Sequence, residues 1–442
     1  MSSFCPVDPT VARRYTLTQY FIDQRKHYPQ ATGDFNALML DVALACKAIS
    51  RTVAFGKLAA LPGQPNPASG IAHAEGKTLA LLTNDCFTQM NNWAGHLAGM
   101  VSEELEEPYQ IPADQPRGKY LLLFDPIDGT SNIEVNGTVG SIFSVLRAPQ
   151  EVVDSGRDVQ AGDFLQPGNR QVAAGYALYG PSTMLVLTVG HGVHGFTLDP
   201  NLGQFLLTHP DMQIPADTQE FAINVANARY WEPPVKRYVD ECLAGKSGER
   251  GKDFNMRYVA SRVAEAHRIL MHGGVFMHPR DTRDPAKPAK LRLLYEANPI
   301  GFLIEQAGGR ASTGYEPVLQ VHPQGIHQRT GFICGSRNEV ELIERYHNEK
   351  MHNAPLRSPL FAERGLLRAL PLGLEHQIYD SSTEIHPHLL IEDSGEVVDL
   401  PADCIRWDAL PPMAPGLEVA TIDMVVRVRR TAAAPDAAAS AA

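Results

Sequence analysis

An apolar run that ends abruptly in two aspartates limits the folds open to this chain. Residues 120–124 read Tyr-Leu-Leu-Leu-Phe, and Asp125-Pro126-Ile127-Asp128 follows directly. A short, uninterrupted apolar run of this kind is typical of a strand buried on both faces. Buried strands of α/β proteins place ligands beyond their carboxyl ends. The run therefore predicts a central strand, over residues 120–124, that delivers two carboxylates to a site.

The residues after these aspartates suit a phosphate group held next to a cation. Gly129 lets the backbone approach a ligand closely, and Thr130 and Ser131 offer hydroxyls and backbone N–H donors. Two aspartates would repel a phosphate unless cations lay between them, and hard oxygen ligands favour Mg²⁺ or Mn²⁺. The structural alternative is an Asx turn that uses the Asp-Gly pair.

Further acids follow apolar runs elsewhere in the chain. Glu103 and Glu104 come after an apolar pair, and Glu296 comes directly after Leu-Leu-Tyr. A buried acid needs a cation or another partner, so these sites and the two aspartates are expected to converge on two metal ions. The alternatives are a solvated face, which we prefer for Glu106 and Glu107, and for Glu296 a helix start stabilised by the helix dipole.

Basic residues that could bind a second phosphate lie at Lys290 and Arg292. A guanidinium binds phosphate as a planar fork and an ammonium binds it as a point charge. The alternative is a surface patch, because a Pro-rich, exposed loop precedes them. The histidines show no spacing typical of a metal site, so we expect them in the core or on the surface.

The composition is that of an ordinary globular protein. Of the 442 residues, 44% are apolar and 20% are charged, which excludes a wholly disordered, collagen-like or coiled-coil chain. The 39 Lys and Arg residues against 50 Asp and Glu residues give a net charge of -11, which argues against a nucleic-acid partner. An acidic balance suits a protein that gathers acids around divalent cations, although most excess acid serves solubility.

Cysteine usage and hydropathy indicate a cytoplasmic protein. The six cysteines are scattered without a Cys-x-x-Cys pair, which predicts reduced thiols in a reducing compartment. Residues 1–11 show no signal-peptide pattern. Residues 171–198 carry no Asp, Glu, Lys or Arg, but glycines and a proline interrupt them, so we expect buried strands and no membrane partner.

Apolar spacing predicts the main elements. Helices are expected over 34–60, 79–100, 234–243 and 259–272, and an apolar segment over 291–306 ends at a Gly-Gly helix stop. Strands are expected over 139–146, 173–178, 184–189 and 195–198, and a loop over 61–70. Beyond residue 348 we expect a Pro-containing linker over 351–373, a hairpin over 388–400 and an alternating apolar and basic strand over 424–429. Residues 431–442 are Ala-rich and expected to be disordered.

Taken together, these motifs resemble the class I fructose-1,6-bisphosphatases from about Thr16 to His347. The stretches that carry the resemblance are Gly118–Tyr120, Asp125–Asn132, Ala173–Gly180, Lys290–Glu296 and Ile326–Arg329. The Asp-Pro-Ile-Asp-Gly-Thr element is shared with the wider superfamily of metal-dependent sugar and inositol phosphatases. The resemblance implies an α/β (α+β) protein with a layered αβαβα fold.

The same resemblance predicts the domain organisation. An N-terminal, allosteric-type subdomain would span 1–208 and a sugar-bisphosphate-binding subdomain 209–347, with the site between them. A linker and small β-rich extension would span 348–430, followed by the tail at 431–442.

The resemblance also implies a reaction, which is Mg²⁺-dependent hydrolysis of the 1-phosphate of fructose 1,6-bisphosphate. Two or three Mg²⁺ ions, for which Mn²⁺ could substitute, would be held by Glu103, Asp125, Asp128, Glu296 and the carbonyl of Ile127. Glu104 and Asp128 would be catalytic, with Glu104 orienting or deprotonating the attacking water. The substrate would be bound by Asp128, Gly129, Thr130, Ser131, Asn224, Tyr258, His278 and Lys290. Arg257 would reach the 6-phosphate of a neighbouring subunit, so a homo-oligomer, a tetramer in this family, is implied.

The chain departs from the family pattern at several positions. Ala80 and Ala74 stand where the family has acids that help to activate water, and His278 stands where it has a tyrosine. Asn224-Val225-Ala226 replaces the family's Asn-Glu-Gly. The family's AMP-inhibition site is partly matched, by Thr32, Gly33, Lys119, Tyr120 and Arg147, although Asn36 replaces a threonine there. Residues 152–169 contain no cysteine, so a thiol-switched loop is not expected.

Two alternatives to this function stay open. Sedoheptulose 1,7-bisphosphate is a possible sole or second substrate, because His278 and Val225 lie where the resemblance implies that sugar length is read. A weakened, regulatory homologue is the other, and the two alanines motivate it. The setting would be gluconeogenesis or the Calvin cycle.

Overall fold

The computed structural model describes residues 15–24, 26, 33–55, 72–284, 287, 289–349, 368–370, 378–380, 388–391, 396–400 and 425–428. The chain divides into two compact units, Met1–Glu349 and Lys350–Ala442. The predicted loop over 61–70, the end of the first predicted helix at 56–60 and the predicted disordered tail lie outside the described residues. In the described part of the chain, no helix is long and apolar enough to cross a membrane.

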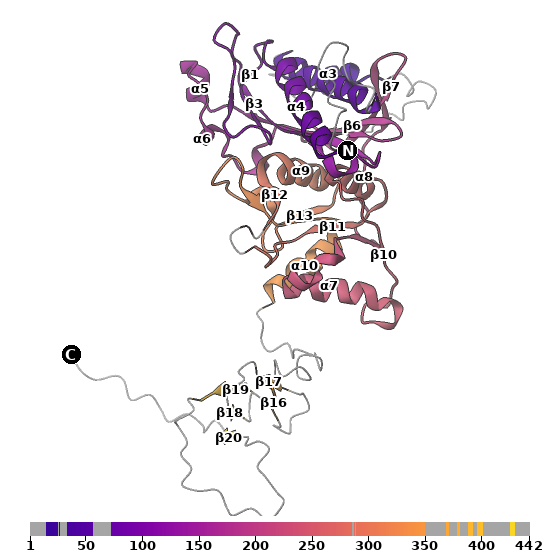
Figure 1. Ribbon diagram of the computed structural model, residues 1–442, viewed down its shortest axis with the longest axis vertical. Coiled ribbons are helices and arrows are strands. Elements are labelled where there is room, and N and C mark those ends of the chain that lie inside the picture. The colour runs from indigo at the N-terminus through magenta and orange to yellow at the C-terminus, as the bar shows by residue number, and fades with distance from the viewer. Residues whose placement is uncertain are drawn as a thin grey trace, which may run out of the picture. The chain divides into compact units, whose positions relative to one another are not determined.

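The first unit is built of alternating helical and sheet layers, which run from top to bottom in Figure 1. An eight-stranded sheet has the order β2-β1-β3-β4-β5-β6-β7-β8, and a five-stranded sheet has the order β10-β9-β11-β15-β13. Strands of the first sheet are β1 (Leu97–Ser102), β2 (Tyr109–Gln110), β3 (Tyr120–Asp128), β4 (Val139–Arg147), β5 (Ala173–Tyr179), β6 (Thr183–Thr188), β7 (His194–Asp199) and β8 (Gln204–His209). Strands of the second are β9 (Glu220–Ala222), β10 (Asn255–Met256), β11 (Val275–His278), β13 (Arg310–Ser312) and β15 (Phe332–Gly335). The layered αβαβα arrangement predicted for the chain is therefore confirmed.

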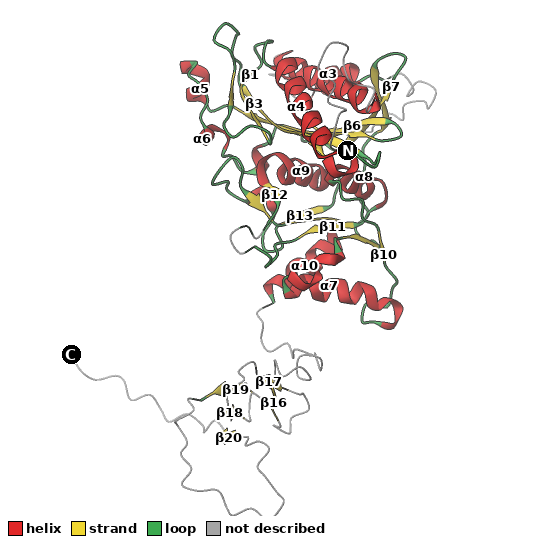
Figure 2. Cartoon of the chain, viewed as in Figure 1, coloured by secondary structure: helices red, strands yellow, loops and turns green. Residues whose placement is uncertain are grey.

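Helices cover both sheets (Figure 2). The outer layer on the first sheet is α2 (Leu17–Gln24), α3 (Gly33–Phe55) and α4 (Ala72–Asn91), and the layer between the sheets is α8 (Arg262–His272) and α9 (Asn298–Gln306). The outer layer on the second sheet is α7 (Pro233–Ala244) and α10 (Arg337–Asn348). Short helices α5 (Gln150–Ser155) and α6 (Ala161–Phe164) lie beside the β1–β3 edge.

Alternating side chains explain why each sheet is covered on both faces. On β3, Leu122 and Phe124 pack toward the outer helices, where the Phe124 ring stacks on Phe87 of α4 at 4.7 Å between ring centroids. Leu121 and Leu123 pack on the opposite face. Every residue of β3 is buried, so the two aspartates at its end are carried into a dry environment.

Four of the strands predicted after residue 138 are observed as β4, β5, β6 and β7, and the helix predicted over 234–243 is α7. The helix predicted over 79–100 is wrong at its end. Helix α4 stops at Asn91, and residues 97–100 belong to β1, which runs parallel to β3. Gly95, four residues beyond the helix, has a φ of 75°, a left-handed conformation that redirects the chain, and the buried Leu97–Met100 run then lies between β2 and β3 in the sheet.

Two further boundaries differ from the sequence prediction, and both shape the site. The helix expected over 259–272 begins at Arg262, because Ala260 has a φ of 63° and the Ser261 hydroxyl caps the Ala264 N–H. The apolar segment over 291–306 is divided into β12 (Leu291–Arg292), a π-helical turn η7 (Leu293–Ala297) and α9. Strand β12 pairs with β14 (Arg329–Thr330).

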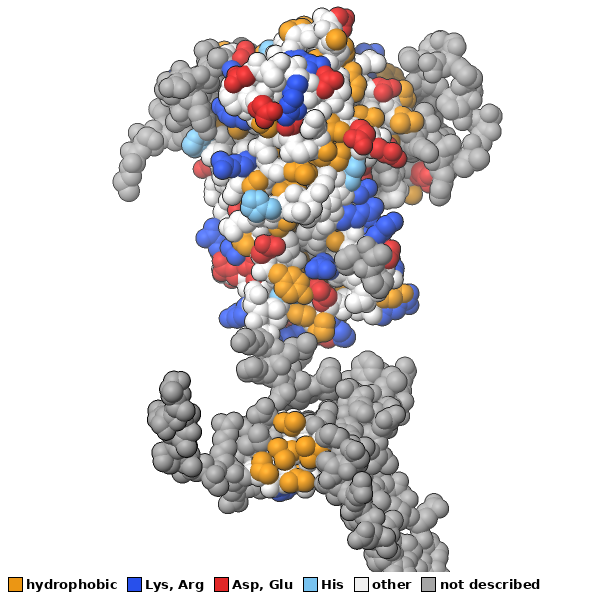
Figure 3. Space-filling view, turned by 90° about the vertical axis from the view of Figure 1, so that its left-hand side faces the viewer, with side chains coloured by type: hydrophobic (Ala, Val, Ile, Leu, Met, Phe, Trp, Pro, Cys, Tyr) orange, Lys and Arg blue, Asp and Glu red, His pale blue; other side chains and the backbone are white. Residues whose placement is uncertain are grey.

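The second unit contains short strands. β16 (Arg368–Leu370) pairs with β17 (Ile378–Asp380), and β19 (Glu396–Asp399), β18 (His388–Ile391) and β20 (Val425–Val428) form a three-stranded sheet. The predicted hairpin is observed as the antiparallel β18–β19 pair, and the predicted alternating strand is β20; residues 392–395 of the turn lie outside the described residues. Val398 and Val426 share one face with Leu389 by register, and this unit shows apolar side chains in Figure 3.

Candidate active site

Three of the carboxylates singled out from the sequence come together. One oxygen each of Glu103, Asp125 and Glu296 lies within 4.8 Å of the others. They belong to segments far apart in the chain: the loop after β1, the strand β3 and the π-helical turn η7. The predicted convergence of these three acids is therefore observed. We refer to them, with Asp128, as the acid cluster.

A local irregularity in β3 turns its two aspartates into site residues. The pairing of β3 with β4 shifts between Asp125 and Asp128, so Pro126 and Ile127 fall outside the regular ladder. Asp125 Oδ1 accepts the Ile127 N–H at 3.0 Å, which is an Asx-type contact. The first aspartate makes this contact, and not the Asp128-Gly129 pair for which an Asx turn was the alternative. Ile127, whose carbonyl is expected to be a metal ligand, is buried within this irregular segment.

Asp128 is held by the start of helix α8. Its Oδ2 accepts hydrogen bonds from the Ser261 hydroxyl at 2.8 Å and from the Val263 N–H at 3.0 Å. Its Oδ1 lies 2.8 Å from a guanidinium nitrogen of Arg262. A helix N-terminus stabilises an anion in this position. Asp128 therefore stands at the junction between the first sheet and the layer of helices beneath it.

Glu296 is positioned by the turn of η7. Its Oε2 accepts the Arg292 N–H, and its Oε1 contacts the Arg262 guanidinium. The Arg292 guanidinium donates to the His327 carbonyl at 2.9 Å, which supports the turn, and its expected part in binding a phosphate stays a prediction. His327 in turn meets the Tyr295 hydroxyl at 2.8 Å and the Glu106 carbonyl at 3.2 Å. These contacts tie η7 to the loop that carries Glu103.

Burial and mutual repulsion dominate the electrostatics of the acid cluster. Burial raises the pKa of Asp125 well above its usual value, and the neighbouring charges of Glu103, Asp128 and Glu296 raise it further. Burial likewise raises the pKa of Glu103 and of Glu296. Asp125 Oδ2 is buried and has no hydrogen-bond partner among the described residues. Four carboxylates lie near the guanidinium charges of Arg262 and Arg292, so the cluster carries an excess of negative charge.

This donor set fits a hard divalent cation. Mg²⁺ and Mn²⁺ prefer carboxylate and carbonyl oxygens, and an unpartnered buried carboxylate oxygen is the donor that such an ion uses. Glu104 lies next to the cluster in sequence but is exposed, and its N–H donates to the Ser102 hydroxyl.

Gly129, Thr130 and Ser131 lead from the acid cluster to the surface. Gly129 has a φ of 81°, and a Cβ there would lie 3.0 Å from the Ser261 Cβ. Thr130 and Ser131 begin the short helix η3 (Thr130–Asn132), and both are exposed. Asn132 Nδ2 donates to the Val259 carbonyl at 3.1 Å, so this turn and the start of α8 are fastened together.

A pocket of about 130 Å³ contains four of the expected substrate residues, Asn224, Tyr258, His278 and Lys290. Ile223, Asn227, Trp231, Met277, Pro279 and Asp281 complete its lining. We refer to it as the sugar pocket. Burial, together with the Arg262 and Lys290 charges, lowers the pKa of His278 to about 4, so its ring is neutral at pH 7. Its Nδ1 is buried and has no hydrogen-bond partner in the described part of the chain.

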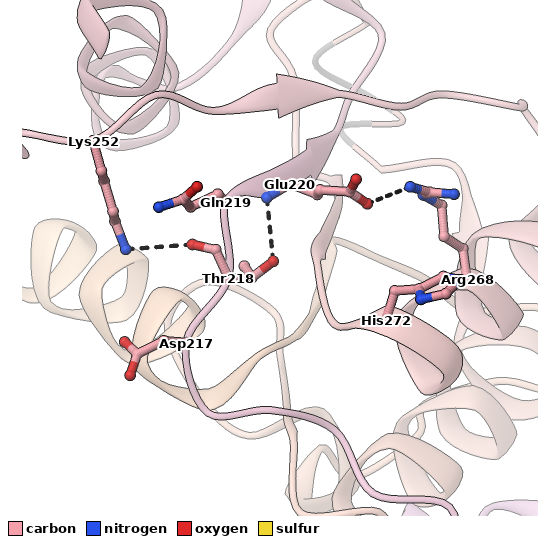
Figure 4. Close-up of a pocket in the computed structure, with 7 residues that line it drawn as sticks. All are labelled: Asp217, Thr218, Gln219, Glu220, Lys252, Arg268 and His272. Atoms are coloured by element: carbon pink, nitrogen blue, oxygen red, sulfur yellow. Dashed lines mark hydrogen bonds and ion pairs between the residues drawn. The ribbon is translucent and has the colours of Figure 1, made fainter. Parts of the chain in front are cut away.

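Arg257 does not line the sugar pocket. Its side chain belongs to a separate small hollow that includes Glu220, Glu265 and Arg268, and its guanidinium donates to the Met256 carbonyl. A larger hollow of about 530 Å³ adjoins that one and is drawn in Figure 4. Its cations are already neutralised, since Arg268 pairs with Glu220 and Lys252 pairs with Glu339. This larger hollow shares no residue with the acid cluster or the sugar pocket.

The residues expected to bind AMP form a separate group at the start of α3. Lys119 pairs with Asp34 at 3.0 Å, next to Gly33, and the Lys119 and Arg147 charges lie over the Tyr120 ring. Tyr120 and Arg147 are cross-strand partners on β3 and β4. Thr32 lies outside the described residues. Asn36 donates from Nδ2 to the Phe21 carbonyl of α2.

The two alanines that replace expected acids both lie in α4. Ala80 is 5% exposed and belongs to the core between the outer helices and the first sheet. Ala74 lies in the first turn of the helix, where the structure describes the backbone alone.

Arg262 is the residue of the site that sequence reasoning missed. It lies at the first position of α8, and its guanidinium joins Asp128 to Glu296. The available signal was a serine with N-cap character followed by an arginine at the start of an apolar, helix-periodic segment. That signal predicts a helix start, and nothing in it says that the arginine points into a cluster of acids.

The fold has alternating helical and sheet layers, and the acid cluster and the sugar pocket both lie near the start of α8 in the middle layer. This combination is that of a sugar phosphatase. Residues 15–210 match the family model described as "Fructose-1-6-bisphosphatase, N-terminal domain", and residues 214–348 match "Fructose-1-6-bisphosphatase, C-terminal domain". The chain belongs to the class 1 fructose-1,6-bisphosphatase family.

Several relatives show the same likeness. A "Fructose-1,6-bisphosphatase class 1" of Hydrogenophilus thermoluteolus is 63% identical over 353 residues, which are 80% of this chain and 97% of that protein. A "Fructose-1,6-bisphosphatase class 1 3" of Methylibium petroleiphilum is 60% identical over 351 residues, 79% of this chain and 97% of that protein. The crystal structure of Leishmania major fructose-1,6-bisphosphatase in holo form matches with a TM-score of 0.66 and 36% identity, covering 75% of this chain and 99% of that one.

Proposed function

We propose that this chain hydrolyses the 1-phosphate of fructose 1,6-bisphosphate, giving fructose 6-phosphate and inorganic phosphate, with Mg²⁺ as cofactor. The observation that carries the proposal is the junction at the start of α8. There Ser261 and Arg262 hold the acid cluster, while Tyr258, four residues before Arg262, lines the sugar pocket. A sugar lying in the pocket would thus present one phosphate to Lys290 and the other to the acids.

Each part of the chain has a chemical task in this proposal. Glu103, Asp125, Asp128, Glu296 and the Ile127 carbonyl would hold two or three ions, and Mn²⁺ would replace Mg²⁺. Mg²⁺ bound there would withdraw charge from the phosphoryl oxygens and favour ionisation of a water molecule. Backbone N–H groups and hydroxyls from Gly129 to Ser131 would orient the phosphate.

The reaction transfers a phosphoryl group to water. The water oxygen forms a bond to phosphorus, the bond between phosphorus and the sugar O1 breaks, and the water proton passes to Glu104. The sugar O1 takes up a proton from solvent as it leaves, and Glu104 returns its proton to solvent. Asp128, held by Ser261 and Val263, would keep the phosphate aligned for this displacement.

The far end of the sugar would be held by Asn224, Tyr258, His278 and Lys290. Arg257 lines a hollow separate from the sugar pocket of its own chain, which suits a residue that serves the pocket of a neighbouring subunit. We therefore propose a homotetramer in which Arg257 reaches the 6-phosphate of that neighbour. The group around Gly33, Lys119, Tyr120 and Arg147 is proposed to bind AMP.

Phosphate release from fructose 1,6-bisphosphate, measured with and without Mg²⁺, tests the proposal. We expect turnover only with Mg²⁺, and we expect Asp125→Asn to lower kcat at least about 100-fold. The exposed Asp240→Asn on α7 is the matched control and should keep full turnover. Added Mg²⁺ should raise the melting temperature of the wild type and not of D125N. Turnover that needs no Mg²⁺, or that survives in D125N, would contradict the proposal.

A second substrate is favoured by the imidazole of His278. An imidazole is smaller than the phenol expected there from the family pattern, and it leaves an unpartnered nitrogen in the pocket wall. Sedoheptulose 1,7-bisphosphate, which is one carbon longer, is the candidate. A larger kcat/KM with the seven-carbon substrate would make it the principal one. Mg²⁺-dependent turnover of either sugar would exclude the regulatory homologue considered from the sequence.

A further inference from the structure

Arg262 occupies one oxygen each of Asp128 and Glu296, two members of the acid cluster that would bind a cation. Asp128 uses Oδ2 for the Ser261 hydroxyl and the Val263 N–H, and its Oδ1 faces Arg262. Glu296 uses Oε2 for the Arg292 N–H, and its Oε1 contacts Arg262. Each carboxylate therefore has one oxygen fixed by the fold and one that meets the guanidinium.

The charge of the guanidinium also acts on the sugar pocket, although Arg262 is not among the residues that line it. The Arg262 charge lowers the pKa of His278, and it opposes the burial that raises the pKa of Tyr258; both residues line that pocket. The Arg262 side chain is 28% exposed, and its Nε has no hydrogen-bond partner among the described residues. It therefore contacts the acids directly and lies near enough to the sugar pocket for its charge to act on two of the lining residues.

We propose that Arg262 is a resident cation of the acid cluster, which pairs with Asp128 and Glu296 while the metal sites are empty and turns to the substrate phosphate when they fill. The proposal rests on the function proposed above and deepens it. It makes Arg262 a residue that couples metal loading to phosphate binding.

Charge balance supports this exchange. A guanidinium and a divalent cation repel each other strongly at a few ångströms in a partly dry site, so both cannot share the same two oxygens. Leaving the acids uncompensated would be costly, and Arg262 removes that cost before loading. After loading, a phosphate dianion offers the planar fork of Arg262 two oxygens in place of the carboxylates. Arg262 thus raises the stability of the metal-free protein and weakens the binding of one metal ion.

Direct metal binding tests the exchange without reference to turnover. Free Mn²⁺ would be followed by electron paramagnetic resonance during titration of wild type and Arg262→Met, without substrate. We expect R262M to bind its weakest Mn²⁺ ion at least about tenfold more tightly than wild type does. Arg268→Met is the matched control, since Arg268 lies on the same helix and pairs with Glu220 outside the cluster, and it should leave Mn²⁺ affinity unchanged.

The second measurement is the affinity of the Mn²⁺-loaded protein for inorganic phosphate. We expect R262M to bind phosphate at least about fivefold more weakly, because a charge-assisted contact is lost. Opposite changes in the two affinities are the signature of the exchange, since a general structural defect would weaken both. Arg262→Gln, which also removes the charge, carries the same expectations if R262M fails to fold.

The outcomes separate this inference from the function on which it rests. Mn²⁺ binding that is equal or weaker in the variants, or phosphate binding that is unchanged, overturns the role of Arg262 alone. Absence of Mn²⁺ binding by the wild type overturns the proposed metal chemistry as well.

Discussion

The environment of His267 keeps its imidazole neutral in the folded protein. His267 of α8 is half-buried, and its Nδ1 lies 2.9 Å from the Tyr176 hydroxyl. Burial lowers the pKa of His267 to about 4, and the nearby His209 and His272 lower it further. The folded protein therefore keeps this ring neutral at pH values where the unfolded chain, with an ordinary value near 6.5, is already protonated.

This difference predicts a loss of stability in mild acid. As the pH falls below about 6.5, His267 binds a proton in the unfolded chain but not in the folded chain. The free energy of unfolding therefore declines until about pH 4. For His267 we expect a loss of about 3 kcal/mol over that range. His267→Gln, which keeps polarity without titrating, should show a shallower decline in urea unfolding between pH 7 and 4.5. The exposed His322→Gln, whose charge does not act on His267, should follow the wild type. An identical decline in H267Q would refute this account.

Residue types at the site were predictable only where the local pattern was unusual. Asp125, Asp128 and Glu296 follow apolar runs. Such a position buries the carboxylate, and a buried carboxylate needs a cation or a hydrogen-bond donor as a partner. Arg262 follows no such pattern. Its role depends on the turn at Ala260 and on contacts with residues more than thirty positions away, and local sequence spacing does not encode them.

The turn at Gly129 determines how closely two elements of the site approach each other. The turn at Gly129 joins β3 to η3, and its left-handed backbone and its closeness to Ser261 leave no room for a side chain. A Cβ at 3.0 Å from the Ser261 Cβ would push apart the two segments that hold Asp128. Gly156 has a similar φ of 63°, but nothing lies within 4 Å of the place where its Cβ would be.

The two glycines separate backbone strain from displacement of the site. Gly129→Ala and Gly156→Ala should each cost about 1 kcal/mol of stability through the left-handed conformation. G129A should in addition lose at least about tenfold in kcat, because Asp128 and Ser261 move apart. G156A should keep its turnover. Equal kinetics of the two variants would show that the packing of Gly129 against Ser261 does not matter for the reaction.

The elements themselves were predictable where apolar spacing had one interpretation. The four strands predicted between residues 139 and 198 alternate or run apolar between turn residues, and they are observed at nearly the predicted bounds. Strand β8 and the strands of the second sheet were not predicted. The helix predicted over 79–100 joined a true helix to a buried strand, because a short apolar run fits either element. The π-helical turn at 293–297 could not be foreseen, since the sequence of that segment reads as continuous with α9 and only tertiary packing closes the wider turn.

On the scale of the whole molecule, the first unit contains every layer that the site requires. The acid cluster, the sugar pocket and the group at the start of α3 all lie between Gly33 and Glu296. The matched family regions end at residue 348, one residue before the first unit ends. The layered fold was predictable because its motifs lie in this region; the role of the second unit was not, because its short strands carry no motif that indicates a chemistry.

These limits predict that a chain shortened after Glu349 folds and keeps the reaction. Helix α10 ends at Asn348, and its buried Val340 and Ile343 complete the core under the second sheet, so the cut leaves that core intact. We expect a melting temperature within about 3 °C of the full chain, as befits removal of a separate unit, and a kcat/KM within about twofold. Sedimentation of both chains would be compared at equal concentration. A shortened chain that is insoluble would show that the second unit is part of the enzyme fold. A shortened chain that folds but forms a smaller oligomer would show that the second unit contributes contacts between subunits. In that case each sugar pocket loses the Arg257 of its neighbour, and KM should rise more than kcat falls.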